Sequence, residues 1–316
     1  MNRFCSFLGS VLILMAFSAC APISQIQSSV SQFDQATHTA ANTETAFLDA
    51  VMTVDCEAQF YEEAYKYALK QQDNFNLKGY CTQNVLTSEQ NATRKSMMDA
   101  IVLYADKMQA LATSDDNKQL DTNSQTLAQN LISLATNSGI KLQNSDSAIV
   151  KVVETAFITI ANLALDQIKC KNIREAALKM QPQLVNVVEA LKNENWAFGQ
   201  AMGKQTGKFG EMELQLKALI AKSHKENNDP AETFFNVVNG RNLLLSLNQV
   251  PKQSFGLPGT APGDPAKPVN DALDAIVNCN KAIAETKSGG INAAANDLYK
   301  RATAALDLYK SIASAK

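Results

Sequence analysis

The sequence predicts an all-α protein: an elongated antiparallel bundle of long helices with two disulfides. Apolar residues recur at steps of three and four along most of the chain, which is the period of one helical face. Ala, Leu, Gln and Lys are abundant, and these residues favour helix. Five of the eight prolines lie between residues 251 and 268, so most of the chain is free of this helix breaker.

The charge of the chain narrows the class of partner. The formal net charge is −2, and Lys and Arg do not cluster in a stripe. Binding to a nucleic acid backbone requires such clusters. We therefore expect no nucleic acid partner.

Residues 1–19 are expected to form a signal peptide. Arg3 supplies a positive start. The apolar run from Phe4 to Phe17 is roughly 14 residues long, short of the ~20 residues that a membrane-spanning helix needs.

The stretch FSAC ends in Cys20 and resembles the lipobox of bacterial lipoproteins. Phe17 departs from the family pattern, which usually has Leu at that position. The resemblance implies cleavage before Cys20, which then carries acyl chains that anchor the protein in a membrane. Because Ala21 rather than Asp follows Cys20, it also implies sorting to the outer membrane, with the chain facing the periplasm.

Residues 20–42 are rich in Ser, Gln, Thr and Ala and are expected to be a lipidated N-terminus and tether, followed by the main helical bundle over residues 43–250. Four apolar residues of the tether are nevertheless spaced for a helix: Ile23, Ile26, Val30 and Phe33. The first bundle helix is predicted over 43–72, where the helical period is carried by Phe47, Val51, Val54, Ala58, Tyr61, Tyr65 and Leu69.

The stretch TSEQ at residues 87–90 predicts a helix start of the capping-box type, with Thr87 as N-cap and Gln90 reaching back. The helix that follows has one apolar face, made of Met97, Ile101, Tyr104, Met108 and Leu111. A further helix is marked by Leu120, Leu127, Leu131 and Leu134.

Residues 148–168 are the most apolar part of the mature chain. We expect a central bundle helix here and not a membrane span, because four polar residues would be costly in hydrocarbon: Lys151, Glu154, Asn162 and Asp166. The β-branched residues of this stretch leave a strand as an alternative.

A long helix is predicted over residues 172–227, bent at Pro182. The stretch NDPAET predicts another helix, with Asp229 as N-cap and its end near Gln249.

Residues 251–269 are expected to form a Pro/Gly-rich loop, and residues 270–316 a C-terminal helical hairpin that packs on the bundle. The last helix carries a heptad-like seam of Ile291, Ala295, Leu298, Ala302, Ala305, Tyr309 and Ile312.

Four cysteines remain in the mature chain besides Cys20, an even number that suits an oxidising compartment. Of the three possible pairings we favour Cys56–Cys81 and Cys170–Cys279. Cys56 lies ~24 Å before the end of its predicted helix, and residues 73–81 can span about 30 Å on the way back. A metal site is a weak alternative, because there is no CxxC pair and only His38 and His224 could add ligands. We expect no metal and no cofactor.

Four glycines, Gly199, Gly203, Gly207 and Gly210, recur at steps of four, four and three within a predicted helix. Each glycine in a helix interior costs about 1 kcal/mol relative to alanine, so this stripe needs a reason. The favoured interpretation is a tight crossing with another helix of the same chain. The alternatives are a self-association face, and a region that rearranges or meets a membrane through Trp196, Phe198 and Phe209.

Four tyrosines near the proposed Cys56–Cys81 disulfide form a second candidate surface, for a protein partner: Tyr61, Tyr65, Tyr67 and Tyr80. A small disulfide-stapled core is the alternative explanation for them.

Motifs of catalysis are scarce, since the chain has no GxSxG, no HExxH and no DxDxDG stretch. We expect no enzyme, but a non-catalytic cell-envelope lipoprotein that acts as an interaction, accessory or scaffold component. Its expected partners are the membrane, through the acyl chains, and another envelope protein, with a homo-oligomer left open. The alternatives are a membrane-acting helical protein of the pore-forming or toxin-like kind, a periplasmic protective protein of the immunity type, and an enzyme whose site is assembled by folding.

Overall fold

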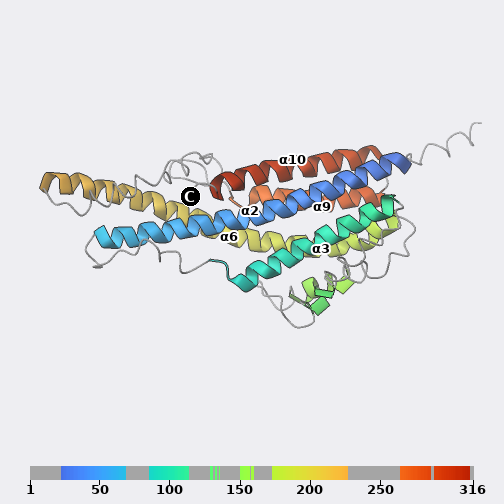
Figure 1. The fold of residues 1–316 in the computed structure, drawn as a ribbon, viewed down its shortest axis with the longest axis horizontal. Helices are drawn as coiled ribbons and strands as arrows, with labels where there is room; N and C mark the ends of the chain where they lie inside the picture. Colours follow the sequence, from blue (N-terminus) through green and yellow to red (C-terminus); the bar gives the residue numbers. More distant parts are fainter. Residues whose placement is uncertain are drawn as a thin grey trace, which may run out of the picture.

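The computed structural model describes residues 23–68, 85–113, 173–226, 264–285 and 288–313, with parts of 129–135 and 150–159. The described part of the chain is helical and contains no strand, so the predicted all-α class is confirmed there. Its long helices are α2 (Ile23–Ala68), α3 (Ser88–Thr113), α6 (Ile173–Glu226), α9 (Lys267–Glu285) and α10 (Ser288–Ala313). They lie side by side in an elongated, bundle-like arrangement (Figure 1). None of the described helices combines the length and apolar character that crossing a bilayer requires.

Helices α2 and α10 run in the same direction along each other (Figure 1). Ser29 of α2 is hydrogen-bonded to Asn292, and the Thr43 hydroxyl donates to the carbonyl of Ala302 at 2.8 Å, so residue numbers rise together. Helix α3 runs the opposite way, because Gln27 of α2 meets its end at Ala112. The predicted antiparallel order therefore holds for chain neighbours such as α2 and α3, but α2 packs in parallel against α10.

The apolar faces predicted for α3 and α10 form much of the core. Four residues of the α3 face are at most 3% exposed: Met97, Ile101, Tyr104 and Met108. The fifth, Leu111, is partly buried. Every residue of the α10 seam is buried as well. At Ala302 of that seam α10 lies close enough to α2 for the Thr43 hydroxyl to donate to its backbone carbonyl.

The start of α3 confirms the predicted capping box. The backbone N–H of Gln90 donates to the Thr87 hydroxyl at 3.1 Å, and the backbone N–H of Thr87 donates to the Gln90 side chain at 3.0 Å. Two backbone donors that the first turn would leave unpaired are thereby satisfied.

Residues 23–42 form the first turns of α2, where the sequence analysis expects a tether. Val30 and Phe33 are 0% exposed and pack in the core. The polar residues do not prevent the helix, because Thr37 and Thr43 donate their hydroxyls to carbonyls one turn back. Burial of one apolar face outweighs the low helix propensity of Ser and Thr.

Helix α6 agrees closely with the predicted long helix and continues through Pro182. A proline inside a helix leaves the carbonyl four residues earlier without its donor. The carbonyl of Ala177, five residues before Pro182, accepts a hydrogen bond from the side chain of Asn280 at 3.0 Å. The Tyr104 hydroxyl donates to the same Asn280 side chain, which links α3, α6 and α9.

Helix α9 begins at Lys267, three residues before the predicted start of the hairpin. The Asp264 carboxylate accepts a hydrogen bond from the backbone N–H of Ala266 at 2.9 Å, and its carbonyl accepts one from Lys267 at 3.0 Å. Pro268 fits within the first turn, where no intrahelical donor is needed.

The structure contradicts the predicted disulfide Cys170–Cys279, because Cys279 is a free thiol. Cys279 is 0% exposed within the core face of α9, where it packs like a small apolar side chain, and burial raises the pKa of its thiol to about 12. Cys56 is disulfide-bonded, and its partner lies outside the described residues. The pairing Cys56–Cys81 therefore stays a prediction.

Several other predictions lie outside the described residues. They concern the signal peptide, Cys20, Cys81, Cys170, Tyr80, the helix at 229–249, and most of the loop at 251–269 and of the segments around 120–134 and 148–168.

Candidate functional site

The glycine stripe of α6 is a close helix contact only at Gly199. A Cβ atom added there would lie 2.9 Å from the Cβ of Ala266 and 3.0 Å from its backbone nitrogen. At Gly203 the nearest described atom, of Pro265, would be 4.0 Å away, and at Gly207 no described residue lies within 4 Å. The tight-crossing interpretation is therefore confirmed for Gly199, which contacts the start of α9, and the described residues provide no such contact at Gly207. The surroundings of Gly210 lie outside the part of the chain that the structure describes.

The tyrosine candidates cannot be assembled into a surface from the described residues. Tyr61, Tyr65 and Tyr67 lie in the last turns of α2, and their side chains lie outside the description, as does all of Tyr80. The partner surface proposed for them stays a prediction.

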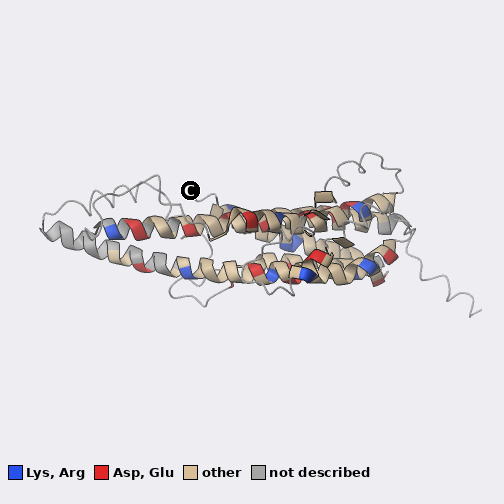
Figure 2. Cartoon of the chain, turned by 90° about the horizontal axis from the view of Figure 1, so that it is seen from below, with Lys and Arg blue, Asp and Glu red and all other residues tan. Residues whose placement is uncertain are grey.

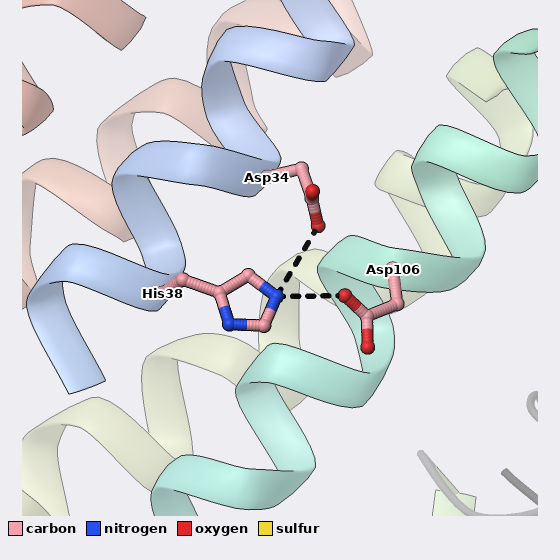
Figure 3. A group of neighbouring side chains, drawn as sticks. All are labelled: Asp34, His38 and Asp106. Atoms are coloured by element: carbon pink, nitrogen blue, oxygen red, sulfur yellow. Dashed lines mark hydrogen bonds and ion pairs between the residues drawn. The ribbon is translucent and has the colours of Figure 1, made fainter. Parts of the chain in front are cut away.

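Helices α2 and α3 instead bring together Asp34, His38 and Asp106, which we name the Asp34 cluster (Figure 3). Asp34 and His38 are one turn apart on α2, so both side chains lie on one face. The Nε2 atom of His38 lies 2.9 Å from Oδ1 of Asp106, within hydrogen-bond distance, and 3.9 Å from Oδ1 of Asp34. One donor atom from each residue lies within 4.8 Å of the others.

The three side chains of the cluster differ in exposure. The side chain of Asp34 is 11% exposed, whereas those of His38 and Asp106 are 50% and 30% exposed. The buried Oδ1 atom of Asp34 has no hydrogen-bond partner. Burial, then the charge of Asp106 and a side-chain hydrogen bond to it, raise the pKa of Asp34 to about 7, although His38 acts in the opposite direction. The cluster thus holds two acidic groups and one imidazole at the edge of the core.

A second charged group, which also includes residues of α2 and α3, is buried except for the partly buried Asn270. We name it the Arg94 network: Glu44, Arg94, Glu194, Asn195 and Asn270. Arg94 is 1% exposed, donates to Glu44 and to Asn195, and lies with its guanidinium 5.1 Å from the centroid of the Phe198 ring. The Asn195 amide donates to Glu44 at 2.9 Å and to Asn270 at 3.1 Å. The network therefore connects α2, α3, α6 and α9.

The surface charges of the described helices are mixed. Basic and acidic residues alternate along the helices in Figure 2 and form ion pairs such as Lys192–Asp274 and Arg301–Asp297. These pairs are solvent-exposed to a large extent and contribute little to stability. Mixed charge of this kind does not form the cluster of basic residues that binding to a polyanion requires.

The sequence analysis missed the Asp34 cluster because it placed His38 in a tether. The spacing of Asp34 and His38 was a usable signal, since residues at i and i+4 on a helix are neighbours. Asp106 carries no such signal, because only the packing of α3 against α2 brings it near. The Arg94 network had no sequence signal either, since its members come from four helices.

No protein-family model, no curated protein and no solved structure significantly matches the chain.

Proposed function

We propose that the protein is a non-catalytic, lipid-anchored component of the cell envelope that acts by binding another envelope protein. The observation that carries the proposal is an exposed apolar stripe on α6. Four of the six exposed large hydrophobic residues among the described side chains belong to this helix, so they are not scattered at random: Leu178, Val185, Trp196 and Leu214.

The spacing of these residues places them on one face. They follow each other at intervals of seven, eleven and eighteen residues. At 100° per residue, all four fall within roughly 20° of one line along the helix. Trp196 is 57% exposed and Leu214 is 66% exposed, and neither is needed to fill the core. These apolar side chains are separated along the line by polar ones such as Glu189, and an aligned set of this kind favours binding to a partner helix that contacts them in turn.

The glycines add to this stripe. Gly203 and Gly207 lie within the same roughly 20° of the line, between Trp196 and Leu214. None of the described residues lies within 4 Å of the Cβ position of Gly207. A partner could therefore approach the α6 backbone closely there, which supports the alternative of an external contact for this part of the glycine stripe.

Two features support location in the envelope. The lipobox-like stretch ending in Cys20 provides an anchor, and α2 begins at Ile23, so few residues would separate the acyl chains from a rigid helix. Cys56 is disulfide-bonded, and disulfides persist in oxidising compartments such as the periplasm. We retain Cys56–Cys81 as the proposed pairing.

Photo-crosslinking in cells tests the binding surface. A photoreactive phenylalanine analogue at Trp196 is expected to trap one envelope protein in a discrete adduct. The matched control is the same analogue at Tyr299 of α10, an aromatic residue that is 52% exposed on a different helix. Equal adducts at both positions, or none at Trp196, would contradict the proposed surface.

Metabolic labelling with radioactive palmitate tests the anchor separately. The wild-type chain is expected to take up label, and Cys20→Ser is expected to abolish it. If the unsubstituted chain takes up no label, the lipid anchor is wrong, whatever the crosslinking shows.

A further inference from the structure

We infer that Asp34, His38 and Asp106 form a binding site for a divalent transition metal, with Zn²⁺ as the reference ion, that joins α2 to α3. This site goes beyond the proposed function and does not depend on it. The inference rests on the donor set, on the spacing of the donor atoms and on the unpartnered carboxylate oxygen of Asp34.

The donor set suits a transition metal. One imidazole and two carboxylates are common ligands of zinc, and a water molecule usually completes such a site. Mg²⁺ and Ca²⁺ prefer sites made of oxygen atoms alone, so the imidazole of His38 selects against them. No Lys or Arg is among the charged groups that act on Asp34, so His38 is the one group there that could supply positive charge from the described residues.

The spacing of the donors also fits. Bonds of about 2.0–2.2 Å place neighbouring donors of a tetrahedral zinc roughly 3.3–3.5 Å apart. The Nε2 atom of His38 lies 2.9 Å from one carboxylate and 3.9 Å from the other, on either side of that value. In Figure 3 the imidazole points into the space between the two carboxylates. The donor atoms of the two carboxylates lie within 4.8 Å of each other, so small side-chain rotations would bring all three donors toward that spacing.

The buried oxygen of Asp34 points to a ligand that the chain does not provide. A buried carboxylate oxygen without a partner is costly, and proteins rarely leave one unsatisfied. Asp34 Oδ1 is such an atom, and it lies on the side of the cluster that faces His38. A bound cation would satisfy it and would also relieve the repulsion between Asp34 and Asp106. The exposed edge at His38 leaves a route for the ion and room for water.

Calorimetric titration with ZnCl₂ tests the site, using the tag-free, full-length chain in detergent after removal of metals with a chelator. We expect one equivalent of Zn²⁺ to bind. His38→Ala and Asp106→Asn should each weaken that binding at least tenfold, and MgCl₂ should give no binding in the same range.

Two control variants should leave the titration unchanged. His224→Ala removes the only other histidine of the chain, and Asp99→Asn removes another half-buried aspartate of α3, outside the cluster. Unchanged Zn²⁺ binding in His38→Ala and Asp106→Asn would overturn the site, and so would the absence of a stoichiometric binding event in the wild-type chain.

Two further measurements separate loss of a ligand from loss of the fold. The Tm of the wild-type chain should rise with Zn²⁺ concentration, whereas the Tm of a folded Asp34→Asn or His38→Ala variant should not. Co²⁺ bound in place of Zn²⁺ should give visible absorption that the ligand variants lose. A Zn²⁺-dependent rise in Tm that persists in these variants would place the ion elsewhere.

Discussion

The Arg94 network and the Asp34 cluster both join α2 to α3, and they lie only six residues apart on α2, from His38 to Glu44. In the network, the chain itself provides a cation for the buried carboxylates, and side chains of α6 and α9 complete the hydrogen bonds. In the cluster, two carboxylates meet one imidazole, the charged groups that act on Asp34 include no Lys or Arg, and Oδ1 of Asp34 has no hydrogen-bond partner.

This difference separates a structural role from a binding role. A buried charge group that contains its own cation fixes how four helices register against one another, although Nε and Nη1 of Arg94 have no hydrogen-bond partner. Removal of one member leaves the others uncompensated. A group that is incomplete and open at one edge costs stability unless something outside the chain completes it. The predictions below test whether the two groups behave in these two ways.

Replacement of Arg94 should have the largest effect. Arg94→Met leaves Glu44 buried without its cation and removes the donor to Asn195, so we expect a loss of about 3–5 kcal/mol in the free energy of unfolding. Urea denaturation followed by circular dichroism measures it. Arg301→Met is the matched control, because Arg301 forms an exposed pair with Asp297 and should change stability by less than about 1 kcal/mol. Similar losses in both variants would show that the buried network stabilises the fold no more than an exposed ion pair does.

A Cβ atom at Gly199 should disturb the same region, because α9 begins directly against it. Gly199→Ala places a methyl group 2.9 Å from the Cβ of Ala266, so we expect a loss of about 1–3 kcal/mol from overpacking. The methyl group of Gly207→Ala meets none of the described residues within 4 Å, so this substitution should instead stabilise the chain by up to about 1 kcal/mol through helix propensity. Thermal unfolding of both variants measures the contrast. Equal effects of the two substitutions on thermal unfolding would contradict the close contact between Gly199 and the start of α9.

The Asp34 cluster should make stability depend on pH when metal is absent. Folded Asp34 holds its proton up to a pKa of about 7, whereas an unfolded aspartate loses it near the ordinary value of 3.8. The folded state therefore binds more protons between these values, so the free energy of unfolding should fall as pH rises from about 4 to about 7. We expect a decrease on the order of 1–2 kcal/mol, because solvent at the edge of the cluster screens part of the effect.

Denaturant unfolding over that pH range, in a chelating buffer, measures this dependence. Asp34→Asn cannot ionise and should flatten the decrease, while Asp99→Asn should keep most of it. The charged groups that act on Asp34 are Asp106 and His38. If the free energy of unfolding of Asp34→Asn falls with pH as much as that of the wild-type chain, the pH dependence comes from other residues.

Removal of the imidazole should have the smallest effect on stability without metal. His38 is half exposed and donates or accepts one hydrogen bond, to Asp106, so His38→Ala should change the free energy of unfolding by about 0.5 kcal/mol or less. The same urea experiment measures it. A loss comparable to that of Arg94→Met would mean that His38 has a structural role like that of the network.

Parts of the fold were predictable because their signals are local. The capping box at Thr87 and the seam of α10 depend on residues three to seven positions apart, and both are as predicted. The predicted tether was wrong because its composition was weighed above the spacing of Val30 and Phe33, which pack in the core. The pairing Cys170–Cys279 was wrong because a count of cysteines says nothing of which face of α9 carries Cys279.

The sequence by itself determined the helical class, the caps and the apolar faces of this protein, since these follow from the period and chemistry of neighbouring residues. The tertiary structure decided that α10 runs parallel to α2, that Gly199 alone among the described glycines of its stripe faces a close neighbour, and that Asp106 reaches His38. Each of these depends on the relative shift of two helices distant in the chain. That shift is set by the packing of whole surfaces and leaves no signature in any one segment.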